Sequence, residues 1–263
     1  MPNPERLCLS VCSLVRKAGK ELIKKRGHKA LSYSVKGKND FVTRFDRETE
    51  KLLAVGLKNI FPEAGFLGEE NQANAEGREY NWIVDPIDGT TNFMHGVPLF
   101  SISVALYGGN RGVLGVIYDP NLDECFYSYG KGKAFLNKRK ISVSKTKQLK
   151  DSLLATGFPQ YDFSRKEEYM KMFFHLMEMC RGIRRPGSAA IDLAWVATGR
   201  FDGFWEYSLK PWDVAAGACI IQDAGGKVFD FSGGNNFLNN RQIIAGNPAI
   251  AGALLKKVKR FFS

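Results

Sequence analysis

The sequence of 263 residues predicts a layered α/β protein, folded as a single domain with two lobes. Apolar residues recur at helical spacing over the first 60 residues, and strands with alternating apolar residues follow from Val97 to Phe135. A mixed helix and strand half completes the chain, and no repeat, low-complexity segment or long linker interrupts it. We therefore expect one domain over residues 1–263, with a lobe boundary near Lys150.

The N-terminal part predicts two helices. Apolar residues spaced by three and four predict the first helix over residues 4–25, and the polar stretch 27–39 predicts a loop. A second helix is expected from Thr43 to the residue before Pro62. Its expected inner side carries Leu52, Leu53, Val55, Leu57 and Ile60.

Short strands are expected to dominate the middle of the chain. Residues 66–67 and 82–84 predict strands on either side of a surface loop over 71–80. Period-two alternation and Gly-Gly-Asn and Asp-Pro-Asn turns predict an antiparallel meander of three strands. These strands cover residues 101–106, 113–118 and 124–129, and a further strand covers 152–156.

The C-terminal half alternates helices with strands. Helices are expected over residues 167–181, 188–199, 211–224 and 248–262, with strands over 203–207 and 243–245. In the first of these helices the Met and aromatic residues are interpreted as core. They are Met170, Phe173, Phe174 and Met177.

The composition is that of an ordinary globular protein, with 44% hydrophobic and 25% charged residues. No apolar run reaches the length of a membrane span and no signal peptide is apparent, so we expect a cytoplasmic protein without a membrane partner. The five cysteines form no C-x-x-C pair, and we interpret them as buried reduced thiols.

The formal net charge is +11, with basic residues concentrated over 16–38, 131–150 and 256–260. Solvated helix and hairpin faces explain these clusters, while a field that attracts phosphorylated substrates is the functional alternative. A nucleic-acid surface is a further alternative, although aromatic residues are not interleaved with the basic ones as in RNA-binding signatures.

The most informative stretch runs from Asp85 to Phe93 and reads DPIDGTTNF. Two carboxylates follow a buried strand, and a Gly-Thr-Thr turn comes directly after them. Carboxylates are hard oxygen ligands that suit Mg²⁺ or Mn²⁺ better than zinc or copper. Amide groups freed by a glycine turn suit a phosphate group. Together they predict metal-assisted phosphoryl chemistry.

The spacing excludes other motifs. Asp85 and Asp88 are three residues apart, one more than in aspartyl-phosphate phosphatases, and no downstream Glu closes an EF-hand loop. Glu69 and Asp213 are each explained in isolation by a solvated loop or a helix N-terminus. If these segments converge with the two aspartates, four like charges meet, and divalent cations would remove their repulsion.

At this point the chain resembles a known family. The motifs Gly68-Glu69-Glu70, Asp85 to Phe93 and Trp212-Asp213-Val214-Ala215-Ala216-Gly217 resemble the three signature motifs of the inositol monophosphatase family, in the same order and at similar separations. The similarity extends over nearly the whole chain. It implies a layered α-β-α-β-α sugar-phosphatase fold, a homodimer and a bacterial inositol-1-monophosphatase-like branch.

The resemblance also implies residue roles. It places Glu69, Asp85 and the Ile87 carbonyl on a first Mg²⁺, with Asp85, Asp88 and Asp213 on a second, and Glu69 near a third ion. It assigns the phosphate to Gly89 and Thr90, and the orientation of the attacking water to Thr90 paired with Asp46. The implied lining for the alcohol part of the substrate is Ser188, Ala189, Glu206 and Asp213, and Lys36 is expected near the metals.

The expected reaction is attack of water on a phosphate monoester, without a covalent phosphoenzyme. Inositol monophosphate or a similar phosphorylated polyol or sugar is the leading substrate. Relatives with the same motifs cleave fructose 1,6-bisphosphate, 3′-phosphoadenosine nucleotides or NADP, and residues 159–165 and 184–190 are expected to decide between them. An RNA- or transcription-associated binding protein that retains the fold is the alternative of another class.

Overall fold

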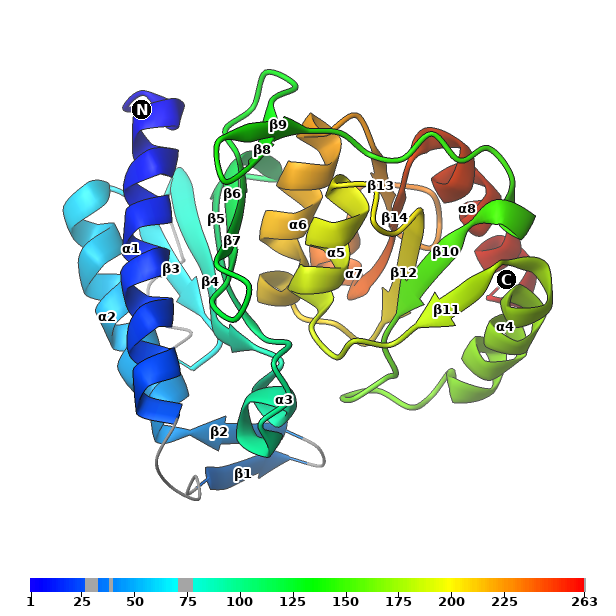
Figure 1. The fold of residues 1–263 in the computed structure, drawn as a ribbon, viewed down its shortest axis with the longest axis horizontal. Helices are drawn as coiled ribbons and strands as arrows, with labels where there is room; N and C mark the ends of the chain where they lie inside the picture. Colours follow the sequence, from blue (N-terminus) through cyan, green and yellow to red (C-terminus); the bar gives the residue numbers. More distant parts are fainter. Residues whose placement is uncertain (27–32, 38–39, 71–77, 263) are drawn as a thin grey trace.

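Five layers stack side by side in the fold, in the order helix, sheet, helix, sheet, helix (Figure 1). The structure is a computed structural model that describes residues 1–26, 33–37, 40–70 and 78–262, without side chains for 33–37 and 40–43. The chain passes from the first sheet to the second between residues 141 and 153. The lobe boundary near Lys150 stays a prediction.

The first sheet has seven strands that follow one another in chain order. Every neighbouring pair is antiparallel except β3 and β4, which are parallel. The strands are β3 (Gly65–Gly68), β4 (Tyr80–Asp88), β5 (Ser101–Gly108), β6 (Arg111–Asp119), β7 (Glu124–Ser128), β8 (Ala134–Leu136) and β9 (Arg139–Ile141). This confirms the expected meander and adds β8 and β9, which are too short to show a period in the sequence.

The second sheet has five strands in the order β11-β10-β12-β14-β13. Strand β10 pairs in parallel with both of its neighbours, and the pairs that involve β14 are antiparallel. The strands are β10 (Leu153–Thr156), β11 (Gly182–Arg184), β12 (Gly203–Tyr207), β13 (Lys227–Phe229) and β14 (Gln242–Gly246). Strand β11 therefore lies at one edge of this sheet.

Helices α1 (Pro4–Arg26) and α2 (Arg44–Ile60) cover the outer face of the first sheet (Figure 1). Each is amphipathic and buries an apolar stripe against β4 to β7. The stripe of α2 includes Leu53 and Leu57, which are fully buried, whereas Val55 is 58% exposed. Val55 was expected on the inner side, and this is wrong because it lies two residues from either buried leucine, on the opposite face.

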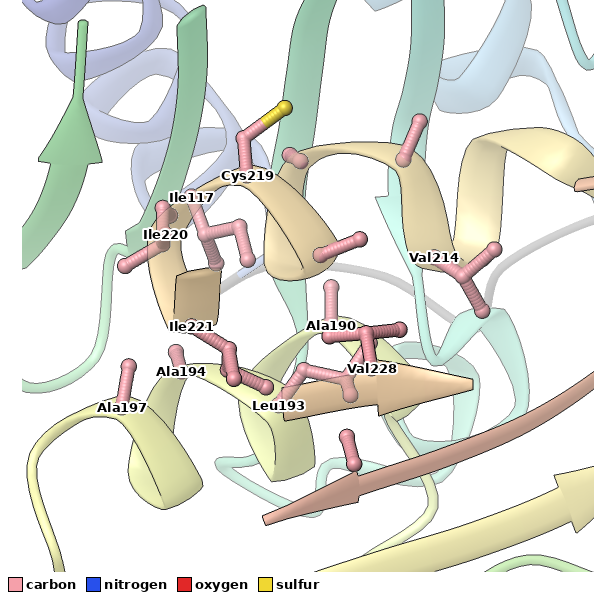
Figure 2. Packing of buried hydrophobic residues seen from close by; sticks show 14 of the residues in the cluster. Ile117, Ala190, Leu193, Ala194, Ala197, Val214, Cys219, Ile220, Ile221 and Val228 are labelled. Atoms are coloured by element: carbon pink, nitrogen blue, oxygen red, sulfur yellow. The ribbon is translucent and has the colours of Figure 1, made fainter. Parts of the chain in front are cut away.

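Helices α5 (Ala189–Ala197) and α6 (Pro211–Asp223) lie between the two sheets (Figure 1). A helix that is covered on both sides is apolar all round, which explains the Ala-rich sequences of both. Figure 2 shows Leu193 and Ala194 of α5 packed with Ile220 and Ile221 of α6 in the core between the sheets. Proline at the first position of α6 suits a helix start.

The outer face of the second sheet is covered by α4 (Lys166–Met179) and α8 (Pro248–Phe261). Helix α4 buries its face of Tyr169, Met172 and Leu176. The expectation that Phe174 and Met177 belong to the core is wrong, because these side chains are 55% and 53% exposed. The sequence of α4 has apolar residues on two faces, and packing against the second sheet buries the face that carries Tyr169, Met172 and Leu176.

The remaining elements are short. They are β1 (Tyr33–Gly37), β2 (Asp40–Thr43), α3 (Thr90–His95), the 3-10 helix Leu149–Asp151 and α7 (Phe237–Asn240). Strand β1 replaces part of the loop expected over 27–39, and of the loop expected over 71–80 residues 71–77 lie outside the described part. All five cysteines are free thiols. None of the helices in the described ranges has the length and apolar character that a membrane crossing requires.

Candidate active site

A bulge in strand β4 turns Asp85 and Asp88 to the same face of the first sheet. Asp85 pairs with Ser103 of β5, and Asp88 pairs with Ser101, so three steps along β4 match two steps along β5. Side chains of a regular strand alternate, and residues three apart would face opposite sides. The one extra residue restores the match, so both carboxylates face α5 and α6 while Ile87 packs toward α1 and α2.

Asp213, in the first turn of α6, completes a group of three carboxylates with Asp85 and Asp88. One oxygen of each lies within 4.8 Å of the others. Burial, and then the charges of Glu69 and Asp88, raise the pKa of Asp85 well above its usual range. Burial, followed by the charge of Asp88, raises the pKa of Asp213 to about 7. Hard oxygen donors with unbalanced negative charge fit a divalent cation such as Mg²⁺ or Mn²⁺.

Asp88 is held by the start of helix α5. The hydroxyl of Ser188, the N-cap residue, donates to Oδ2 of Asp88, and the amide of Ala190 donates to the same oxygen over 2.7 Å. Burial raises the pKa of Asp88 to about 6, although these hydrogen bonds oppose the rise. Ser188 and Ala189 were expected to contact the alcohol part of the substrate. Both line the cavity, but Ser188 also fixes Asp88.

Thr90 begins helix α3 directly after the carboxylates. Its hydroxyl lies 3.0 Å from the Ile87 carbonyl and 3.2 Å from Oδ1 of Asp46, so the expected pairing with Asp46 is present. Gly89 precedes it with φ of 93°, a left-handed conformation that favours glycine. The first amides of a helix have no acceptor within the helix. A phosphate group at this turn would supply one.

Asp46 and Glu69 belong to other elements and lie near the group of three carboxylates. Asp46 lies in the first turn of α2 and is 1% exposed. Glu69 follows β3, lines the same cavity as Asp85, and its charge raises the pKa of Asp85. Glu69 does not belong to the tight group of three carboxylates. The side chain of Lys36 lies outside the described residues.

A cavity of about 370 Å³ joins the carboxylates to the second sheet. Its lining includes Glu69, Asp85, Ile87, Asp88, Gly89, Thr90, Ser188, Ala189, Glu206 and Asp213, which were predicted from the sequence. Glu206 of β12 is 6% exposed and lines the cavity from the second sheet. The segment 157–161 and Arg185 form further parts of the wall.

The lining also includes Asp192, which sequence reasoning missed. An acidic residue near a helix start is common for electrostatic reasons, so Asp192 in α5 was not singled out. Its flanks in α5 are apolar, and an acid within an apolar helix would have been the available signal.

The layered α/β fold and this group of buried carboxylates define a class of protein in which acidic side chains from several elements can hold a divalent cation. The profile of the inositol monophosphatase family matches residues 5–261. The chain belongs to the inositol monophosphatase family.

Its relatives carry two kinds of name. The inositol-1-monophosphatase of Mesorhizobium japonicum is 43% identical over 93% of this chain and 92% of its own. The Nus factor SuhB of Pseudomonas aeruginosa is also 43% identical, over 87% of this chain and 86% of its own. The crystal structure of the extragenic suppressor protein SuhB from Bartonella henselae has a TM-score of 0.90 at 41% identity, and covers 95% of this chain and 97% of its own.

Proposed function

We propose that this protein is a Mg²⁺-dependent phosphomonoesterase that hydrolyses inositol monophosphate or a similar polyol phosphate. The observation that carries the proposal is the convergence of Asp85, Asp88 and Asp213 within 4.8 Å beside the start of α3. Family membership and the inositol-1-monophosphatase names among its relatives support it.

In this proposal the chain's own groups bind and orient the reactants. The amides of Gly89 and Thr90 bind the phosphate oxygens, and the Thr90 hydroxyl, paired with Asp46, orients a water molecule and takes up its proton through the carboxylate. Glu206, Ser188, Ala189 and Asp213 surround the alcohol.

Three of the residues proposed to hold the cations, Asp85, Asp88 and Asp213, form the tight group, and Glu69 and Ile87 line the same cavity. Glu69, Asp85 and the Ile87 carbonyl would hold one ion, while Asp85, Asp88 and Asp213 would hold a second, with Glu69 near a third. Bound Mg²⁺, or Mn²⁺ in its place, would supply the positive charge that activates water and stabilises the departing oxygen.

The first test is the variant Asp88→Asn, which keeps the shape of the side chain and removes its charge. We expect phosphate release from inositol 1-phosphate to be abolished while the circular dichroism spectrum is retained. The control is Asp119→Asn, because Asp119 is fully buried and lies outside the cavity. Near-normal turnover by Asp88→Asn would contradict the proposal.

The identity of the alcohol is a separate question. Fructose 1,6-bisphosphate, 3′-phosphoadenosine nucleotides and NADP would be cleaved by the same chemistry. A panel of these compounds with inositol 1-phosphate, compared by kcat/KM across a Mg²⁺ titration, ranks them. A highest kcat/KM for a nucleotide would replace the polyol in the proposal while leaving the reaction intact.

A second candidate function is association with RNA or the transcription apparatus. The relative named Nus factor SuhB and the net charge of +11 favour it. On helix α1 the exposed Lys17 and Lys20 offer charge for phosphates, whereas Arg16, Lys24 and Lys25 pair with acidic residues. We expect RNA binding at low salt that falls steeply as salt rises. Binding that is undetectable at low salt would remove this candidate.

We also propose a homodimer. Strand β11 leaves one edge of the second sheet unpaired within the described chain, and the exposed Phe174 and Met177 of α4 lie in the helix that packs beside this sheet. A second copy would cover this apolar surface. Sedimentation of the double variant Phe174→Ser, Met177→Ser as a monomer is the expected result. A wild-type protein that is monomeric at micromolar concentration would contradict it.

A further inference from the structure

Asp192 is a buried carboxyl group in the cavity wall that lacks a hydrogen-bond partner for one of its oxygens. Its side chain is 1% exposed, and its Oδ1 atom is buried without a hydrogen-bond partner. Within the described part of the chain, no donor and no cation lies within hydrogen-bond or ion-pair distance of this carboxylate. A buried polar group without a partner is costly, and native proteins retain one where a ligand or water completes it.

The position of Asp192 places it at the alcohol end of the cavity. It lies four residues after Ser188, one turn further along α5 and on the same face of the helix. Ser188 donates to Asp88, and Asp192 lines the same cavity, where the charge of Glu206 acts on it more strongly than the charge of Asp88. Burial, and then the charge of Glu206, raise the pKa of Asp192 well above its usual range, so the two carboxyl groups share one environment.

Glu206 is equally without a donor among the described residues. Its carboxylate lies against Gly157, where an added Cβ atom would collide with both of its oxygens. The alcohol end therefore offers two acceptor groups held by different elements, α5 and β12, and no protein donor for either. Substrate hydroxyl groups are donors that would satisfy both without adding charge.

We propose that Asp192 is a specificity-determining residue that accepts a hydrogen bond from a substrate hydroxyl, while Glu206 accepts from a neighbouring one. The substrate class is a phosphate monoester whose alcohol carries hydroxyl groups on adjacent carbons. This inference rests on the proposed function, because it assigns the part of the substrate that the phosphate chemistry leaves open.

Arg185 offers a competing explanation for the buried carboxylate of Asp192. Its guanidinium group lies 5.7 Å from the ring centre of Phe158 and lines the cavity, and its charge lowers the pKa of Asp192. If Arg185 paired with Asp192 in solution, the carboxylate would be a structural group. Its removal would then impair every substrate alike, which a comparison of two substrates detects.

The test compares inositol 1-phosphate with cyclohexyl phosphate, which has the same ring and no hydroxyl groups. For Asp192→Ala we expect KM for inositol 1-phosphate to rise about tenfold, the usual effect of losing one hydrogen bond to a charged group. We expect kcat with this substrate, and both constants with cyclohexyl phosphate, to stay within about twofold, since uniform binding affects KM alone. Asp192→Asn, whose amide oxygen still accepts, should lie between wild type and Asp192→Ala.

Asp119→Ala is the matched control, because Asp119 is also buried, also has an oxygen without a partner, and lies outside the cavity. Asp119→Ala should change KM and kcat for both substrates by the same factor. Equal losses with both substrates in Asp192→Ala and Asp192→Asn, or no loss in either, would overturn the role of Asp192. A wild-type enzyme that hydrolyses neither substrate with Mg²⁺ would instead overturn the proposed function, and this inference with it.

Discussion

The buried carboxylate group makes the stability of the metal-free protein depend on pH, and Asp88 illustrates the effect. Burial raises the pKa of Asp88 from 3.8 to about 6 in the folded chain. Well below pH 3.8 the group is protonated in both folded and unfolded chains. As the pH rises, the unfolded chain loses its proton first, so stability is lost between about pH 4 and pH 6.

The size of the effect follows from the shift. One pKa unit corresponds to about 1.4 kcal/mol, so Asp88 alone accounts for about 3 kcal/mol of lost stability. For a domain of this size that is a fall of roughly 6 °C in the melting temperature. Asp213, with a pKa of about 7, extends the loss of stability to higher pH. In the proposed function Mg²⁺ binds the ionised groups, and it should then stabilise the protein more at pH 7.5 than at pH 5.

The assay is thermal unfolding of chelator-treated protein between pH 4 and pH 8, with and without Mg²⁺. The variant Asp88→Asn cannot ionise at this position and should lose about 3 kcal/mol less across the range than wild type. Asp151→Asn, which removes an exposed carboxylate outside the cavity, serves as the control. The same pH dependence in wild type and Asp88→Asn, or equal stabilisation by Mg²⁺ at both pH values, would refute the reasoning.

Three further predictions concern individual contacts. Ser188→Ala removes the N-cap of α5 and a donor to Asp88, and should lower the free energy of unfolding in urea by about 2 kcal/mol. Gly157→Ala should displace the Glu206 carboxylate and raise KM for inositol 1-phosphate about tenfold, with cyclohexyl phosphate unaffected. Thr90→Val removes the hydroxyl that contacts the Ile87 carbonyl, and should lower kcat about 100-fold in steady-state assays with little change in KM.

Each of these has an outcome that would contradict it. An unchanged urea midpoint for Ser188→Ala would mean that neither contact contributes to stability. Equal effects of Gly157→Ala on both substrates would mean that Glu206 does not bind the alcohol part of inositol 1-phosphate. A kcat of Thr90→Val close to that of wild type would remove the hydroxyl from the reaction.

The candidate site could be predicted from the sequence because most of its proposed functional residues lie in short contiguous motifs. The stretch from Asp85 to Phe93 carries two carboxylates and the turn together. Glu69 and Asp213 could be interpreted as metal ligands only in combination with this stretch. The fold class followed from periodicity and from the order of the elements, since long amphipathic helices and a regular meander have clear patterns. The four carboxylates line one cavity in the structure.

What could not be predicted depends on packing between distant elements. Helix α4 has apolar residues on two faces, and contacts with the second sheet and α8 decide that Met172 is buried and Phe174 exposed. Asp192 was missed for a related reason. Its importance comes from the absence of a described partner, and the sequence alone does not show which donors surround a side chain.

The bulge in β4 means that the backbone conformation of this segment, as well as the identity of its side chains, decides whether the site forms. An exchange of Pro86 for another residue changes one side chain and leaves the two aspartates on the same face. An unbroken β4–β5 ladder over the same residues would turn one of the two carboxylates away from α5, because residues three apart in a regular strand face opposite sides. A change that removes the bulge would therefore dismantle the site without altering any of its functional residues.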